Sequence, residues 1–363
     1  MQLELLLPGK IGLMENNLKV VFWGTPDFAI PALKSLINFG YHIEAVVTQP
    51  EKPVGRAKVI LPSPVKKFAL ENNIKVFEPH SLKKDPAPNL SAGRHSEKGR
   101  VWGGAGEEFF KQFKHLNPDL CIVAAYGKII PSRYLDIPKY GFINIHPSLL
   151  PKYRGPSPIQ TAILNGDSET GVTIMKVDEE VDHGPTLSFV KHSVSNKTYY
   201  KEVVNDLAKI GAKLLIETIP KYLNGEIKPR EQDHSQATFT KMFERADGKI
   251  DWNKPAETIY NQIRALNPEP GTWTLLRQSF AQVYGTAKQG FGGQSKVLNI
   301  KKAELLSQPT NELEPGTIIK MNKKVAVKTA TSYLILGTLQ LEGGKEMNAE
   351  SFFNGHPNFT SLY

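Results

Sequence analysis

The stretch Leu18-Lys19-Val20-Val21-Phe22-Trp23-Gly24-Thr25-Pro26, with the residues that follow it, decides the fold class. Its β-rich start ends at Gly24 and Pro26, and the segment 28–39 then has the apolar spacing of a helix that stops at Gly40. The same strand-then-helix order repeats downstream. Further strands are expected at 43–47, 75–77, 120–125, 142–145, 172–177 and 186–190, and helices at 64–71, 158–164 and 197–223. This alternation predicts an α/β fold with a Rossmann-like, mostly parallel sheet and helices on its faces.

The last third of the chain has a different pattern. Short β-rich runs separated by Gly, Pro and Asn predict strands at 296–300, 316–320, 324–329 and 333–339, after a helix at 255–266. They indicate a small, OB-like β-barrel as a second domain. We therefore expect an extension at 1–16, a first domain at 17–224, a linker at 225–236 and a second domain at 237–363. Two Gly-rich segments, at about 85–106 and 278–293, are expected to be inserts.

Composition excludes several classes of protein. With 363 residues and 40% hydrophobic content, the chain is long enough for two cores and too apolar for general disorder. No apolar run approaches the ~18 residues of a membrane span, and the patch at 1–13 lacks the basic lead and cleavage site of a secretory signal. The single cysteine, Cys121, excludes an internal disulfide and a cysteine metal cluster, so we expect a cytoplasmic protein without membrane contact. A net charge of +9 favours an acidic partner, although a solvated basic surface explains it equally well.

Several catalytic motifs are absent from the sequence. The turn at 24–29 lacks the three-glycine spacing that lets a backbone approach a dinucleotide pyrophosphate, which disfavours NAD. There is also no phosphate-binding lysine loop, no Gly-x-Ser-x-Gly elbow and no pair of histidines at metal-ligand spacing.

The densest polar cluster is Asn144-Ile145-His146-Pro147-Ser148-Leu149-Leu150-Pro151-Lys152-Tyr153-Arg154-Gly155. Alternate side chains of a strand share a face, so Asn144 and His146 would project together where the sheet ends, which is where open α/β sheets bind ligands. The polar loop 178–185 could bring the carboxylate of Asp182 toward this imidazole. For such residues taken alone, a structural histidine and an Asx-type turn acid are the commoner outcome.

These residues resemble the folate-dependent formyltransferases that use 10-formyltetrahydrofolate. The resemblance rests on Asn144-x-His146, on the run from Ser148 to Gly155 and on Asp182-x-Gly184-Pro185. Gly24-Thr25-Pro26-Asp27-Phe28-Ala29, Thr48-Gln49-Pro50, Gly55-Arg56, Ile250-Asp251-Trp252 and Arg264-Ala265-x-Asn267-Pro268 extend it along most of the chain. It implies a catalytic first domain, a tRNA-binding barrel, and formyl transfer from 10-formyltetrahydrofolate, as co-substrate, to the α-amino group of initiator methionyl-tRNA for translation initiation. His183, where a small residue is expected, and the two inserts depart from the family pattern.

The resemblance also implies roles for single residues, without a metal or a nucleophilic residue. Asn144 and a protonated His146 would face the oxyanion of a tetrahedral intermediate, and Asp182 would orient His146 and help to move a proton. The expected folate-binding residues are Ser148, Leu149, Leu150 and Pro151 on one wall and Tyr126, Gly127, Lys128 and Ile130 on the other. The residues expected to contact tRNA are Lys52, Arg56 and Lys58, with Lys301, Lys302, Lys320, Lys323, Lys324 and Lys328 as a second basic track. A monomer is expected.

Three other functions stay open at this point. The first is formyl transfer to a small amine substrate, against which the basic second domain and the Gly55-Arg56 loop argue. The second is a 10-formyltetrahydrofolate hydrolase, which would share all three catalytic residues. The third is an RNA-binding barrel attached to an inactive sheet domain, for which the loss of one of these three residues would be the signature.

Overall fold

The structure, a computed structural model, describes residues 18–54, 59–83, 105–278, 296–306, 313–321 and 323–363. It divides into two compact units, each described here by itself. The first comprises Met1–Pro156, Thr170–His192 and Val204–Phe239, and the second comprises Ser157–Glu169, Ser193–Val203 and Thr240–Tyr363. The expected extension and nearly all of both expected inserts lie outside the described residues. None of the described helices combines the length and the apolar character needed to cross a membrane.

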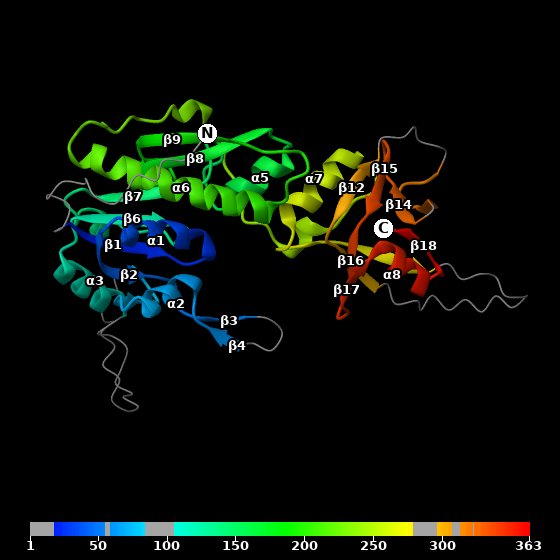
Figure 1. The fold of residues 1–363 in the computed structure, drawn as a ribbon, viewed down its shortest axis with the longest axis horizontal. Helices are drawn as coiled ribbons and strands as arrows, with labels where there is room; N and C mark the ends of the chain where they lie inside the picture. Colours follow the sequence, from blue (N-terminus) through cyan, green and yellow to red (C-terminus); the bar gives the residue numbers. More distant parts are fainter. Residues whose placement is uncertain (1–17, 55–58, 84–104, 279–295, 307–312, 322) are drawn as a thin grey trace, which may run out of the picture. The chain divides into compact units, whose positions relative to one another are not determined.

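A seven-stranded sheet forms the centre of the first unit, with the strand order β5-β2-β1-β6-β7-β8-β9 (Figure 1). Its strands are β1 (Lys19–Gly24), β2 (His42–Val47), β5 (Val76–Phe77), β6 (Leu120–Ala124), β7 (Phe142–His146), β8 (Glu169–Lys176) and β9 (Thr186–Ser193). The pairs β1–β2, β1–β6, β2–β5 and β6–β7 are parallel, whereas β7–β8 is antiparallel. The predicted α/β class with a Rossmann-like, mostly parallel sheet is confirmed.

The described helices of the first unit are α1 (Ile30–Asn38), α2 (Pro64–Glu71), α3 (Ala105–Leu116), α4 (Ser132–Leu135) and α6 (Tyr200–Leu223), with the short 3-10 helices η1 (Asp27–Ala29) and η2 (His234–Gln236). Local sequence signals explain the bounds of α2 and the end of α1. Helix α2 has the predicted bounds because Pro64 occupies its first turn and the Ser63 hydroxyl accepts the Lys66 N–H at 3.1 Å. Helix α1 ends before Gly40, whose φ of 84° suits a glycine after a helix.

One segment expected as a loop, 49–58, contains a strand. β3 (Lys52–Val54) pairs antiparallel with β4 (Val59–Leu61), so a hairpin replaces part of the expected loop. Val59, Ile60 and Leu61 of β4 are 50%, 62% and 53% exposed. The hairpin therefore presents an apolar strand to solvent, a feature that the basic composition of the segment did not predict.

An aromatic cluster fixes the strands that carry the polar cluster. The ring of Trp23, near the end of β1 and fully buried, lies 5.1–6.1 Å from the centres of five other rings, each edge to face with it. These rings belong to Phe109, Phe113, Tyr126, Tyr134 and Phe142. Cys121 of β6 is buried in the same core, and burial raises the pKa of its thiol well above the ordinary value. The strands β1, β6 and β7, whose carboxyl ends lead to the site, thus pack against one buried aromatic core.

The second unit contains two antiparallel sheets, ordered β17-β16-β11-β10-β18 and β12-β15-β14-β13. Its elements are α5 (Pro158–Leu164), η3 (Arg245–Gly248), α7 (Ala256–Leu266), β10 (Thr272–Gln278), β11 (Lys296–Ile300), β12 (Ala303–Leu306), β13 (Ile318–Met321), β14 (Lys324–Lys328), β15 (Tyr333–Leu336), β16 (Thr338–Leu341), β17 (Glu346–Asn348), α8 (Ala349–Gly355) and β18 (Phe359–Leu362). The prediction of a small barrel domain is confirmed. One strand prediction is wrong: 333–339 forms two strands, β15 and β16, which belong to different sheets and are separated by Gly337.

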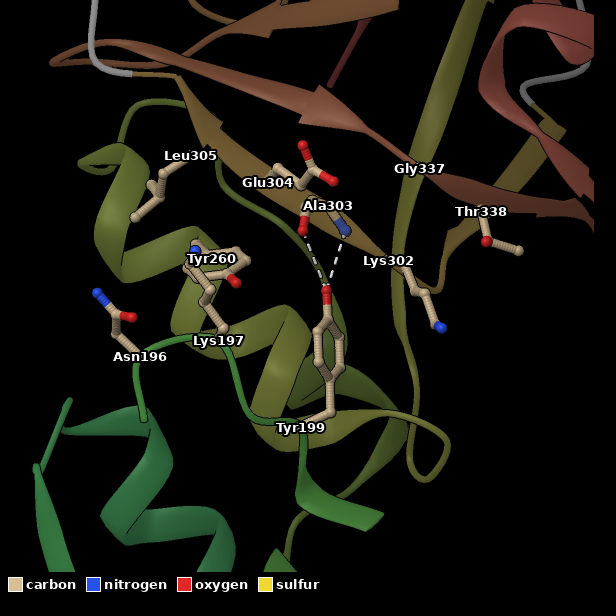
Figure 2. A pocket seen from close by; sticks show the side chains of 10 residues that line it. All are labelled: Asn196, Lys197, Tyr199, Tyr260, Lys302, Ala303, Glu304, Leu305, Gly337 and Thr338. Carbon is tan, nitrogen blue, oxygen red and sulfur yellow. Dashed lines mark hydrogen bonds between the residues drawn. The ribbon is translucent and has the colours of Figure 1, made fainter. Parts of the chain in front are cut away.

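A hollow of about 560 Å³ lies within the second unit (Figure 2). Among its lining residues, Tyr199 donates its hydroxyl to the Ala303 carbonyl at 3.1 Å and accepts the Ala303 N–H at 3.1 Å. Lys197, Lys302 and Glu304 also line it, so the hollow is bordered by charges of both signs.

Lys328 was expected to belong to a basic surface track that contacts tRNA. Its side chain is buried and donates to the Thr329 carbonyl at 2.6 Å, so its assignment to a surface track is wrong.

Candidate active site

The predicted catalytic residues lie at one edge of the first unit's sheet. β6 and β7 run parallel, with Val123 opposite Asn144, so the segments after both strands leave the sheet at the same edge. The strand pleat places Asn144 and His146 on one face of β7, as predicted. Asp182 comes from the loop between β8 and β9, and its side chain is 15% exposed.

The carboxylate of Asp182 joins these two side chains. Its Oδ1 accepts an N–H of the Asn144 amide at 3.3 Å and lies 3.4 Å from Nδ1 of His146. Its Oδ2 accepts the backbone N–H of Gly155 at 2.8 Å. The structure therefore brings together all three residues that the sequence singled out, around a single carboxylate oxygen.

His146 is held between two oxygen acceptors. Its Nε2 lies 2.9 Å from the carbonyl oxygen of Tyr153, and its Nδ1 faces Asp182. A carbonyl and a carboxylate can only accept, so the imidazolium, which donates from both nitrogens, satisfies both contacts. The ring is 4% exposed, and its Nε2 meets a backbone carbonyl, where the resemblance implied an oxyanion.

Asp182 is ionised at neutral pH in this environment. Burial is the largest single influence and acts to raise the pKa of its carboxyl. The charge and hydrogen bond of His146, the N–H of Gly155 and the charge of Arg154 act in the opposite direction, and together they hold the pKa of Asp182 below its ordinary value. A negative charge therefore faces the imidazole across the working range of pH.

The residues expected on one folate wall follow β7 directly. Ser148 is fully buried, and its hydroxyl donates to the Lys152 carbonyl at 2.6 Å, so this side chain fixes the loop. The Leu150 N–H donates to the hydroxyl of Thr173 on β8 at 3.2 Å, and that hydroxyl donates to the Ser148 carbonyl at 2.7 Å. Leu149, Leu150 and Pro151 are half-buried and so keep surface for a ligand.

The residues expected on the opposite folate wall differ in exposure and in whether side chain or backbone borders the loop. The ring of Tyr126 lies in the aromatic cluster and is 1% exposed, so only its backbone borders the loop after β6. Its carbonyl accepts the Gln49 amide at 2.8 Å and the Thr25 hydroxyl at 3.2 Å, which ties the loops after β1, β2 and β6 together. Lys128 donates to the carbonyls of Pro79 and His80 at 2.9 and 3.3 Å. Of this wall, Gly127 is exposed and Ile130 is buried.

The expected tRNA contacts of the hairpin fall largely outside the described residues. Arg56 and Lys58 are not among them, and for Lys52 only the backbone, at the start of β3, is described. Their role stays a prediction.

Sequence reasoning assigned no role to three residues beside the site. Arg154 is 3% exposed and donates from Nε and Nη2 to the side-chain oxygen of Gln232, at 3.2 and 2.8 Å. Gln232 is 7% exposed although it lies in the segment expected as a linker. The hydroxyl of Thr238 accepts the Tyr153 N–H at 2.8 Å. The motif around Arg154 was visible in the sequence, but nothing in it signals partners some 80 residues away.

His183, which departs from the family pattern, has two partners in the structure. Its Nδ1 lies 2.7 Å from a carboxylate oxygen of Asp178. Its ring stacks on that of His234, with centres 4.1 Å apart and planes 3° from parallel. The side chain is accommodated beside Asp182 without replacing any contact of the three catalytic candidates.

Two family models match the chain. The model described as "Formyl transferase" matches residues 18–219, and the one described as "Formyl transferase, C-terminal domain" matches residues 242–357. Solved structures agree in fold. The N-formyltransferase from Helicobacter canadensis in complex with folinic acid and dTDP-3-aminofucose is 16% identical with a TM-score of 0.58, covering 91% of this chain and 100% of that one. HypX from Aquifex aeolicus in complex with tetrahydrofolic acid is 14% identical with a TM-score of 0.56, covering 92% of this chain and 46% of that one.

Curated relatives are more similar in sequence. The methionyl-tRNA formyltransferase of Caldanaerobacter subterraneus subsp. tengcongensis is 37% identical over 339 residues, which are 93% of this chain and 97% of that protein. The methionyl-tRNA formyltransferase of Sulfurihydrogenibium sp. is 38% identical over 341 residues, with the same two coverages. Both halves of the chain and nearly the whole length of these relatives are matched, so the chain belongs to the methionyl-tRNA formyltransferase family.

Proposed function

We propose that the protein transfers the formyl group of 10-formyltetrahydrofolate to the α-amino group of initiator methionyl-tRNA, for translation initiation, and that Asn144, His146 and Asp182 carry the reaction. The observation that carries the catalytic assignment is the shared carboxylate oxygen, Asp182 Oδ1, 3.3 Å from Asn144 and 3.4 Å from His146. An amide donor, an imidazolium and an orienting acid are the groups that an acyl transfer without a covalent enzyme intermediate requires.

Asn144 and His146 stabilise the negative oxygen that forms when the amine attacks the formyl carbon. The Asn144 amide has two N–H groups and gives one to Asp182, which leaves the other for the oxyanion. The Tyr153 carbonyl holds the Nε2–H of His146 in place at 2.9 Å, and the oxyanion shares this N–H with it when substrate binds. Preorganised donors of this kind typically contribute about 3–4 kcal/mol each to the lowering of the barrier.

Asp182 keeps His146 oriented through the reaction. The new C–N bond forms at the α-amine, the bond from the formyl carbon to the folate nitrogen breaks, and one proton passes from the amine to that leaving nitrogen. The ionised carboxylate of Asp182, beside both donors, is placed to help move this proton through a water molecule. The products are a formylated amine and tetrahydrofolate.

The substrate sites follow from the loops at the sheet edge. Ser148, Leu149, Leu150 and Pro151 would border the folate on one side, where the last three keep accessible surface. The backbone from Tyr126 to Ile130 would border it on the other side. Lys52, Arg56 and Lys58 of the hairpin would contact the tRNA, and the barrel, which we place at 237–363 after a catalytic domain at 17–224 and a linker at 225–236, would bind its backbone.

The assay that tests the function compares formyl acceptors. The protein is incubated with 10-formyltetrahydrofolate and, in parallel, initiator methionyl-tRNA, the same tRNA without methionine, free methionine or water alone. We expect transfer to methionyl-tRNA only. Equal transfer to free methionine would contradict the tRNA assignment, and formate release in water at the same rate would make the protein a hydrolase.

We further propose that the protein acts as a monomer in the cytoplasm. The single cysteine is buried and cannot form an internal disulfide, so the fold does not depend on an oxidising compartment. Sedimentation at the assay concentration tests the first statement, and fractionation of the cells that make the protein tests the second.

A further inference from the structure

The turn that carries Asp182 is held in a strained conformation. Asp182 has a φ of 50°, in the left-handed region that residues other than glycine rarely adopt. The amide nitrogen of Gln232 lies within hydrogen-bond distance of three successive carbonyl oxygens of this turn, those of Asp182, His183 and Gly184, at 3.0, 3.0 and 2.7 Å, and its two N–H groups are shared among them. These contacts compensate for the strain, because without them three carbonyls would lose a buried donor.

Gln232 can hold the turn only with its amide in one orientation. Arg154 donates twice to its side-chain oxygen, so the NH2 group must face the carbonyls. A rotated amide would set the NH2 group against the guanidinium and its oxygen against the three carbonyls. Arg154 therefore determines which way Gln232 points, and Gln232 determines where Asp182 lies.

The other acceptor of His146 is held in the same way. Tyr153 has a φ of 64°, and this conformation directs its carbonyl to Nε2 of His146 at 2.9 Å. Thr238 fixes it with two contacts: its hydroxyl accepts the Tyr153 N–H at 2.8 Å, and its carbonyl accepts the N–H of Arg154 at 2.8 Å. Gln232 and Thr238 thus act on opposite sides of one imidazole.

We propose that Gln232 and Thr238 are positioning residues for formyl transfer, which set the two acceptors between which His146 is oriented. The inference rests on the proposed function, because its readout is formyl transfer to methionyl-tRNA. Neither residue touches the reacting atoms in this proposal. Each acts through a strained backbone, Gln232 on Asp182 and Thr238 on Tyr153. Their loss should therefore slow the chemical step and leave substrate binding unchanged.

Thr238 gives the sharper test, because its side chain is exposed and its replacement should leave the fold intact. Thr238→Val keeps the shape and removes the hydroxyl, whereas Thr238→Ser keeps the hydroxyl. We expect about a 10-fold fall in kcat for Thr238→Val, with the KM values for methionyl-tRNA and folate within twofold of wild type, and near-normal kcat for Thr238→Ser. A normal kcat in Thr238→Val, or an equal loss in Thr238→Ser, would overturn the proposal.

Gln232→Met tests the other side, with Gln236→Met as its control. Gln236 lies four residues on, is exposed and bonds only Asp233 among the described residues, at 2.6 Å. We expect kcat to fall about 100-fold in Gln232→Met and less than twofold in Gln236→Met, each measured below its own thermal midpoint. Equal kcat in both would refute the role of Gln232. A wild-type protein that does not formylate methionyl-tRNA would instead refute the proposed function, so the two failures are distinguishable.

Discussion

Replacing Asp182 by asparagine perturbs the site at the atom on which the mechanism depends. The carboxylate accepts from Asn144 at 3.3 Å and from Gly155 at 2.8 Å, and it lies 3.4 Å from the Nδ1 of His146. A side-chain amide has one accepting oxygen and one donating nitrogen. If the oxygen keeps the short bond to Gly155, the NH2 group faces two donors. The acceptor that orients the Nδ1 of His146 is then lost.

The expected loss follows from the misorientation of His146 as a donor. A preorganised donor aimed at the oxyanion contributes about 2.7–4 kcal/mol, and each 1.36 kcal/mol is a factor of ten in rate, so kcat should fall about 100- to 1,000-fold. Binding should survive, because Asp182 is not proposed to touch either substrate in the ground state. The KM values should therefore stay within about threefold of wild type.

Single-turnover formylation with labelled 10-formyltetrahydrofolate and saturating methionyl-tRNA measures this loss directly. Glu180→Gln is the matched control, since it makes the same change at an exposed acid two residues earlier in the same loop. A turnover in Asp182→Asn within threefold of the control would refute the orientation of His146 by the carboxylate.

The pKa of Asp182 lies below its ordinary value of 3.8, so its ionised form stabilises the fold above that pH, and this contribution is lost as pH falls through the lowered pKa. The urea midpoint of wild type should therefore exceed that of Asp182→Asn by a constant amount from roughly pH 5 to 7, and this excess should shrink below pH 3.8. An excess that grows as pH falls would contradict the lowered pKa of Asp182. Arg56→Ala should raise the KM for methionyl-tRNA and flatten the salt dependence of tRNA binding while unfolding is unchanged, and an unaltered affinity at low salt would exclude the contact. Trp23→Ala removes a fully buried ring that contacts five others and should cost about 3–5 kcal/mol of unfolding free energy by urea titration, whereas a loss below about 1 kcal/mol would mean that the aromatic cluster repacks.

The sequence predicted elements well where local chemistry determines them. Helix α2 and strand β11 have the predicted bounds, because a Ser-Pro start and a β-rich run between turn residues are strong local signals. Gly337 shows the limit. The run 333–339 looks like one strand, yet the chain changes sheets at this glycine, and only the packing of two sheets determines that.

The candidate site also contains residues that the sequence indicated and residues that it could not indicate. The pleat of β7 was enough to pair Asn144 with His146, and the family motif indicated Asp182. Gln232 and Thr238 could not be found from the sequence, because their effect lies in hydrogen bonds to backbone groups about 50 to 85 residues away. Backbone acceptors carry no residue type, so no motif records them. Lys328 illustrates the opposite error, since a charged residue taken as a surface contact is buried and bonded to a carbonyl.

The position of Cys121 has a practical consequence. Its thiol is sealed within β6 and resists ionisation, so maleimide reagents, which react with thiolates, should leave it unmodified while the protein is folded. A second cysteine introduced at an exposed position would then be the sole point of attachment for a fluorophore, with no need to remove the native one. A fluorophore on Ile60→Cys, at a residue 62% exposed on the hairpin, would then test whether tRNA reaches the hairpin as proposed.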